Sequence, residues 1–179
     1  MFEATEKKQN KRQPKKITPQ RLKNIALYYL KRFDSSINNL RQVLRNRVND
    51  YAYYNPEWNK NEAYEWIEKI LVDFERYGYL DDARYTELKV KNYVNAGKSA
   101  HYITNKLKQK GIADSLVAEF LEEQGYDSYE MALRFARKKR IGPFRVDENR
   151  KEFRQKDMAV LLRAGFDYDA VQNVMSYEE

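Results

Sequence analysis

Three short combinations of residues in this sequence have the types needed for catalysis or ligand binding. Gly97-Lys98-Ser99 matches the end of a phosphate-binding loop, but Asn92 stands where that motif needs its first glycine, and a helical pattern rather than a strand precedes it. His101 is the sole histidine and there is no cysteine, so the sequence predicts no zinc site and no thiol nucleophile. Asp81 and Asp82 are adjacent acids at the start of a predicted helix, where capping and the helix dipole explain them. We therefore expect no enzyme activity, no metal and no cofactor.

Positive charge, by contrast, is concentrated in one stretch of the chain. The net charge is +7 and the pI about 9.3. Residues 134–156, here called the basic segment, contain ten basic residues and three acids. A merely solvated helix face usually mixes charges of both signs, so the segment favours an anionic partner, although a basic protein without an anionic ligand is the alternative. The ten candidate binding residues are Arg134, Arg137, Lys138, Lys139, Arg140, Arg145, Arg150, Lys151, Arg154 and Lys156.

Helices must position these side chains, because apolar residues recur at helical spacing and no alternating run is long enough for a sheet. Thr18-Pro19 is a typical helix start. All six glycines lie where a helical pattern stops, which is typical of helix C-termini. The sequence therefore predicts an all-α fold of nine helices. The expected N-terminal caps are Asp81 or Asp82, Ser99, Asp114, Asp127 and Asp167.

The helical pattern repeats. The stretch from Leu107 through Gly111 to Leu121 recurs 54 residues later, which predicts equivalent buried positions for Val117 and Val171 and for Phe120 and Val174. Three related units predict an elongated tandem array that shares interfaces between neighbours. The alternative is a single helical bundle whose repeats are coincidental. The predicted divisions are a disordered basic tail at 1–17, a first three-helix unit at 18–78, a second at 79–125 and a third at 126–179.

Two parts of the chain lie outside this repeat. The first unit carries an insertion at 49–62 with Tyr51, Tyr53, Tyr54 and Trp58, which either form a contact surface, such as a platform for bases, or fold back on the unit. The tail at 1–17 is either a solubilising segment or a binding arm. The N-terminus has no signal-peptide pattern and the longest apolar run is too short to span a bilayer, so we expect a cytoplasmic protein that does not bind membranes.

The residues from Phe74 to Tyr85 closely resemble the central signature of the RecX family. The segment from Gly97 to Ile112 resembles the part of the family that follows, and Ala132, Ala136, Arg137 and Lys138 resemble the start of its third unit. The resemblance covers about residues 18–176; the tail and the 49–62 insertion depart from it. It implies a fold of tandem three-helix units, in which the matched residues have a structural role: Gly78, Leu80, Asp81, Asp82, Arg84, Tyr85 and Gly111.

Members of that family are RecA regulators. The resemblance implies a monomer that lodges in the groove of the RecA–DNA filament, inhibits the RecA ATPase and strand exchange without a cofactor, and so modulates recombination, DNA repair and the SOS response. DNA would be bound weakly or within the filament. The resemblance does not identify contact residues, so the role of the basic segment rests on its charge. The alternative function is a direct DNA-binding module built of helix-turn-helix-like units.

Overall fold

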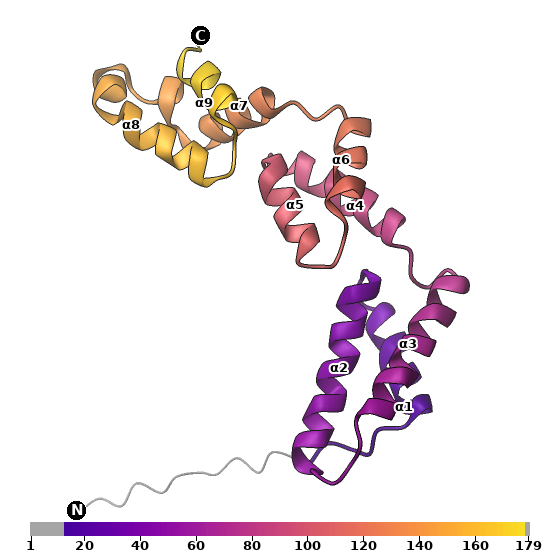
Figure 1. Cartoon of the computed structure of the whole chain (residues 1–179). Coiled ribbons are helices and arrows are strands. Elements are labelled where there is room, and N and C mark those ends of the chain that lie inside the picture. Colours follow the sequence, from indigo (N-terminus) through magenta and orange to yellow (C-terminus); the bar gives the residue numbers. More distant parts are fainter. Residues whose placement is uncertain (1–12, 178–179) are drawn as a thin grey trace, which may run out of the picture. The chain divides into compact units, whose positions relative to one another are not determined.

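The computed structural model describes residues 13–177, apart from the side chain of Asp147 (Figure 1). Over that range the chain forms nine α-helices, one 3-10 turn and no strand, so the prediction of an all-α fold with nine helices is confirmed. Residues 1–12, most of the predicted tail, lie outside the described residues. The elements are α1 (Pro19–Leu30), α2 (Ile37–Tyr54), α3 (Asn61–Arg76), α4 (Asp82–Asn95), α5 (Ala100–Lys108), α6 (Asp114–Glu123), α7 (Ser128–Lys139), η1 (Gly142–Phe144), α8 (Asp147–Arg163) and α9 (Tyr168–Met175).

These elements belong to two compact bodies. The first holds the described residues up to Asp34 together with Asn39–Leu80, and therefore α1, most of α2 and α3. The second holds Ser35–Asn38 and the described residues from Asp81 onward, and therefore the first residues of α2 and all of α4 to α9. The elongated array and the division into three units stay predictions.

The core of the first body comes from one apolar face of each helix. The hydroxyl of Thr18 accepts a hydrogen bond from the amide of Arg21 (3.2 Å), and Pro19 occupies the first turn, so α1 begins where the sequence predicts. The predicted tail includes Ile17, which is buried in this core instead. Phe33, predicted on the apolar face of the first helix, is exposed because α1 has ended at Leu30. The buried residues of the three helices are Leu22, Ala26, Leu40, Leu44, Val48, Ala63, Ile67, Ile70, Leu71 and Phe74.

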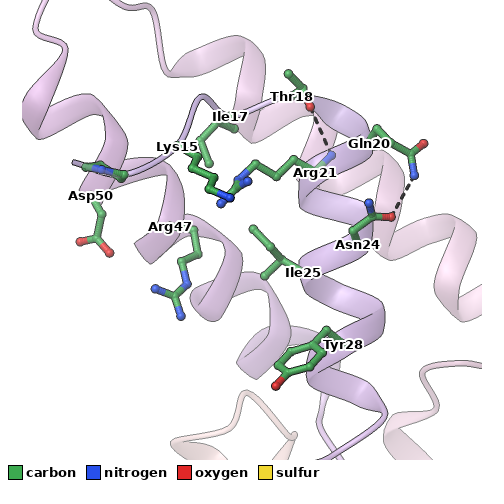
Figure 2. A pocket seen from close by; sticks show the side chains of 11 residues that line it. Lys15, Ile17, Thr18, Gln20, Arg21, Asn24, Ile25, Tyr28, Arg47 and Asp50 are labelled. Carbon is green, nitrogen blue, oxygen red and sulfur yellow. Dashed lines mark hydrogen bonds between the residues drawn. The ribbon is translucent and has the colours of Figure 1, made fainter. Parts of the chain in front are cut away.

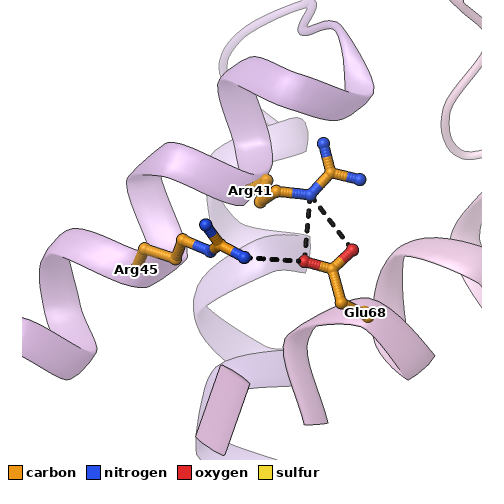
Figure 3. Close-up of polar contacts among 3 residues, drawn as sticks. All are labelled: Arg41, Arg45 and Glu68. Atoms are coloured by element: carbon orange, nitrogen blue, oxygen red, sulfur yellow. Dashed lines mark hydrogen bonds and ion pairs between the residues drawn. The ribbon is translucent and has the colours of Figure 1, made fainter. Parts of the chain in front are cut away.

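One polar link joins α2 and α3 on the side of this core (Figure 3). The Arg41 Nε donates to both carboxylate oxygens of Glu68 at 3.0 Å, and an Arg45 Nη2 lies 3.3 Å from one of them. The three side chains are partly exposed to solvent, so the link contributes little to stability and mainly fixes how the two helices lie.

The insertion at 49–62 lengthens α2 and then turns back to α3. Helix α2 continues to Tyr54, so only residues 55–60 form a connection. The rings of Tyr51 and Trp58 meet edge to face, with centroids 4.9 Å apart, whereas Tyr53 is 80% exposed. The two readings of this insertion therefore divide between its residues: Tyr51 and Trp58 fold back on each other, and Tyr53 faces solvent.

The predicted signature residues lie where helices end and begin. Gly78 has a φ of 72°, which allows the amides of Tyr79 and Leu80 to donate to the carbonyl of Phe74. Asp81 caps α4 by accepting from the amide of Arg84 (2.9 Å). The neighbouring carboxylate of Asp82 has a separate role, because it accepts from the amide of Ile37, the first residue of α2 (2.8 Å). Leu80 and Tyr85 are buried, while Arg84 is exposed.

The 54-residue offset is visible in the cores of the second body. Val117 and Val171 are both fully buried, as predicted. The prediction for the second pair is wrong in one member, because Val174 is fully buried but Phe120 is only half-buried. Phe120 packs against the edge of the α4–α6 core, where part of its ring meets solvent.

Most of the predicted caps are confirmed, and one is wrong. Ser99, Asp127 and Asp167 each accept a hydrogen bond from the amide three residues later, as does Asp81. Asp114 is not a cap, because α6 begins at Asp114 itself and the preceding residue has no side-chain oxygen. Its carboxylate instead lies 2.9 Å from the Nζ of Lys108. An acid in the first turn still favours the helix through the helix dipole.

Candidate functional site

The basic segment runs from the last two turns of α7, through η1, into the first three turns of α8. Helix α7 ends at Arg140, whose φ of 54° is left-handed, and the amide of Ile141 donates back to the carbonyl of Ala136. Ile141, Gly142 and Pro143 are buried. The turn between the two helices is therefore fixed by its own packing, and the cations on either side of it start from an ordered backbone.

A buried carboxylate holds this turn in place. Asp157, in α8, is 2% exposed and accepts hydrogen bonds from the amide of Gly142 (2.8 Å) and from two nitrogens of Arg145 (2.9 and 2.7 Å). The Arg145 guanidinium, together with the Gly142 amide, holds the pKa of Asp157 below its usual range, and the same pair raises the pKa of Arg145. A two-pronged bond of this kind fixes both position and orientation.

Four of the ten predicted binding residues are thus engaged within the protein. Arg145 is bound to Asp157, as described. Arg134 donates to the carbonyl of Asn95 (3.3 Å), Arg150 to the carbonyl of Arg145 (2.8 Å), and Arg154 to the carbonyl of Met175 (3.0 Å). Carbonyl oxygens carry no net charge, so Arg134, Arg150 and Arg154 add to the local positive potential, whereas the charge of Arg145 is balanced by Asp157.

The other six are exposed, and none has a carboxylate partner among the described residues. We call them the outer cations: Arg137, Lys138, Lys139, Arg140, Lys151 and Lys156. Two of them rest on aromatic rings, since the guanidinium carbon of Arg137 lies 4.9 Å from the centroid of Phe144 and the Nζ of Lys156 lies 4.8 Å from that of Phe153. Such contacts restrain the side chain while leaving its charge accessible. The arrangement can attract and hold an anion.

Comparison with known proteins follows from this geometry. Residues 81–121, which span α4 to most of α6, match the model of the second three-helix domain of RecX. A regulatory protein RecX of Myxococcus xanthus (strain DK1622) is 35% identical over 173 residues, which cover 94% of this chain and 91% of the relative. The chain belongs to the RecX family. It is thus a member of a family of regulatory proteins, as the signature from Phe74 to Tyr85 predicts.

Further relatives agree with this assignment. A regulatory protein RecX of Halorhodospira halophila (strain DSM 244 / SL1) is 29% identical over 151 residues, 84% of each chain. The fold resembles the crystal structure of RecX from Lactobacillus salivarius with a TM-score of 0.65 and 22% sequence identity, covering 88% of this chain and 94% of that one. At that identity the likeness concerns the fold alone, and RecX structures therefore share this helical architecture.

Sequence reasoning overlooked Asp157, which decides how the basic segment of this RecX family member is presented. Asp157 lies one residue beyond the segment and was not among its acids. A signal was available, because Phe153, Asp157 and Leu161 are spaced four residues apart and so share one face of α8. An acid on the apolar face of a helix indicates a buried partner, although the sequence does not identify which cation that is.

The candidate chemical residues are occupied in structural roles. The hydroxyl of Ser99 accepts from the amide of Tyr102 and donates to the carbonyl of Ala164. His101 is exposed and lies 2.8 Å from the amide nitrogen of Asn105. In the described range, no group of three or more His, Cys, Asp or Glu residues comes together as a metal site. No described helix combines the length and apolar character needed to cross a bilayer.

Proposed function

We propose that this chain binds the RecA–DNA filament and inhibits the RecA ATPase and strand exchange, and that it thereby modulates recombination, DNA repair and the SOS response. Membership of the RecX family supports a regulatory role. The observation that carries the proposal is the set of outer cations around the α7–η1–α8 turn, which lack carboxylate partners among the described residues. A nucleoprotein filament is polyanionic, so these cations speed the encounter and contribute to binding.

The turn favours this role because its backbone is held before binding. The bonds of Asp157 to Gly142 and Arg145 fix the connection, so fewer backbone torsions have to be ordered when the filament binds. Occupation of the filament groove by a helical body is sufficient to obstruct strand exchange. The mechanism therefore requires no cofactor and no catalytic group from this chain.

The second candidate function is direct DNA binding by helix-turn-helix-like units. The same outer cations favour it, because lysine and arginine side chains neutralise DNA phosphates whether or not RecA is present. The two functions differ in where the binding energy arises. A filament regulator gains affinity from RecA surfaces, so it binds RecA-coated DNA more tightly than bare DNA.

The experiment is the DNA-dependent ATPase of RecA from the same organism, measured while this chain is titrated in, alongside strand exchange. We expect both rates to fall at or below one chain per RecA subunit. Bare-DNA binding is measured in parallel. Unchanged ATPase and strand exchange at concentrations where the chain is bound to filaments would contradict the regulatory function. Equal affinity for bare and RecA-coated DNA would favour the direct DNA-binding module.

A further inference from the structure

The first body has a pocket that the proposed function does not use (Figure 2). Its volume is about 640 Å³, and it lies against α1, α2 and the segment that precedes α1. All of its lining residues belong to the first body. Those that matter for its chemistry are Lys15, Arg21, Ile25, Tyr28, Arg47 and Asp50.

One wall of this pocket is cationic. Lys15, Arg21 and Arg47 line it together with a single acid, Asp50. In Figure 2 the charged ends of Lys15 and Arg21 point toward the same part of the pocket, while the carboxylate of Asp50 points away from them. Over the part of the chain that the structure describes, none of the three cations forms an ion pair. Like charges that converge in this way favour an anion between them.

The Nε of Arg21 gives independent evidence that an acceptor is missing. This nitrogen is buried from solvent and has no hydrogen-bond partner among the described residues. A buried donor without a partner costs free energy, about 1–3 kcal/mol for a typical group and more for a charged one. A ligand oxygen placed at the guanidinium removes that cost. Arginine also presents several donors in a plane, an arrangement that matches the oxygens of a phosphate.

The other wall of the pocket is apolar and aromatic. Ile25 lines it, and Tyr28 is 64% exposed with its hydroxyl held by an Arg32 Nη1 at 2.8 Å. An accessible, oriented ring beside a cationic groove is the arrangement with which proteins hold single-stranded nucleic acid, the phosphate on the cations and the base on the ring. The adjoining sequence agrees in charge, because residues 1–17 contain six basic residues and two acids.

We propose that this pocket binds a nucleotide unit of single-stranded nucleic acid. Arg21, Lys15 and Arg47 hold the phosphate, and Tyr28 supports the base. An acidic peptide offers charge for the cations but no planar group that an exposed ring selects, so the pocket favours nucleic acid. The inference goes beyond the proposed function and does not depend on it, because it concerns the first body and requires no RecA.

The test is the binding of a fluorescent oligodeoxythymidylate to the full chain over a series of salt concentrations. The variant Arg21→Gln/Arg47→Gln removes two charges from the pocket, and Lys23→Gln/Lys69→Gln removes two exposed charges elsewhere on the first body. Each phosphate contact to a single strand contributes about 0.7 to the slope of log affinity against log salt. We expect the pocket variant to flatten that slope by about 1.4, and the control to leave it nearly unchanged.

The variant Tyr28→Ala separates the ring from the charges. Loss of one stacked base weakens binding by about 5- to 150-fold, but it releases no counterion, so the salt slope is expected to stay as in the wild type. Arg21→Lys keeps the charge and removes the planar group of donors. We expect it to retain most of the slope while lowering affinity. Circular dichroism establishes that each variant is folded.

A direct measurement on the wild type complements the variants. The Nε–H signal of Arg21, followed by nitrogen-15 NMR, is expected to shift on addition of oligodeoxythymidylate and not on addition of poly-glutamate. An unshifted signal during oligonucleotide binding, or a pocket variant indistinguishable from its control, would overturn the proposal, as would a shift caused by poly-glutamate alone. RecA plays no part in these measurements, so their failure is distinct from failure of the regulatory function.

Discussion

The hydroxyl of Ser99 donates a hydrogen bond to the backbone carbonyl of Ala164, 2.6 Å away. Ser36 makes the same contact with the carbonyl of Lys110, also at 2.6 Å. The two serines directly precede the first residues of α5 and α2, and they are 63 residues apart, while the two acceptors are 54 residues apart. One kind of helix junction therefore occurs twice within the second body, at positions that follow the sequence repeat.

A glycine follows each acceptor, and both glycines are tightly enclosed. A Cβ atom on Gly165 would lie 2.7 Å from the Oγ of Ser99, and one on Gly111 would lie 2.4 Å from the Cβ of Asn38. Both glycines also have positive φ angles, 89° and 79°. The junctions thus require glycine for two reasons, the left-handed backbone and the close approach of a neighbouring helix start.

The enclosure of Gly111 predicts an unusually costly alanine. Gly111→Ala is expected to destabilise the second body by about 2–4 kcal/mol, because the left-handed backbone adds about 1 kcal/mol to an overpacking cost of about 1–3 kcal/mol. Gly125→Ala is the control, because Gly125 has a φ of 60° but no neighbour within 4 Å of a Cβ. It is expected to cost about 1 kcal/mol.

Amide hydrogen exchange in α5 and α6 is the suitable measurement, because both tryptophans, Trp58 and Trp66, lie in the first body and their fluorescence does not report on the second. Asn38→Gly in the Gly111→Ala background removes the atom that the new methyl group meets, so a favourable coupling is expected in that double-mutant cycle. Equal losses for Gly111→Ala and Gly125→Ala would contradict the close approach.

Asp157 predicts a pH-dependent contribution to stability. Its folded pKa is lowered by Arg145 and the Gly142 amide, so the stabilisation is fully present above the unfolded pKa, about 3.9, and is lost as the pH falls through the lower folded pKa. Asp157→Asn is expected to destabilise the α7–α9 region by about 1–3 kcal/mol at neutral pH. The difference from the wild type is expected to narrow below about pH 4.

Urea unfolding followed by circular dichroism, repeated across this pH range, measures the effect, and exchange of the α8 amides localises it. Glu119→Gln removes an exposed acid of the same body and is expected to change stability by less than about 0.5 kcal/mol. A loss for Asp157→Asn that is the same at pH 3 as at pH 7 would show that the contribution of Asp157 does not come from its ionised form.

The exposure of Phe120 predicts a smaller cost than the repeat alone implies. A fully buried phenylalanine loses about 3–5 kcal/mol on replacement by alanine, but half-burial reduces the expected loss for Phe120→Ala to about 1–2 kcal/mol. Leu107→Ala in the same core is the comparison, since Leu107 is 1% exposed and is expected to cost about 2–5 kcal/mol. Amide exchange in α6 measures both. A greater loss at Phe120 than at Leu107 would place the ring in the centre of the core.

Local signals predicted much of this structure. Helix starts at Thr18, Ser99, Asp127 and Asp167 follow from residue type and spacing, because an N-terminal cap needs only its own helix. Asp114 failed as a cap because two neighbouring residues can each begin a helix, and the sequence does not decide between them. Phe120 failed for a related reason, since a position on an apolar face can lie at its edge.

Contacts between distant residues were beyond the sequence. Nothing near Asp82 indicates that its carboxylate receives the amide of Ile37, 45 residues earlier, and nothing near Arg145 indicates Asp157 as its partner. The candidate site was consequently predicted in composition but not in detail. Charge alone located the basic segment, whereas only the structure separates the outer cations from those that hold carbonyls or a carboxylate.

The most direct test of the account is filament affinity after removal of three outer cations. Lys138→Gln/Lys139→Gln/Arg140→Gln is compared with Lys23→Gln/Lys69→Gln/Lys91→Gln, which removes the same charge from other exposed positions. Binding to RecA–DNA filaments and to bare DNA is measured across a salt series, with folding checked by circular dichroism. We expect the outer-cation variant to bind filaments at least about tenfold more weakly than the control, with a salt slope lower by up to about 2–3 if the three side chains contact phosphates. A folded outer-cation variant with the filament affinity of its charge-matched control would contradict the account.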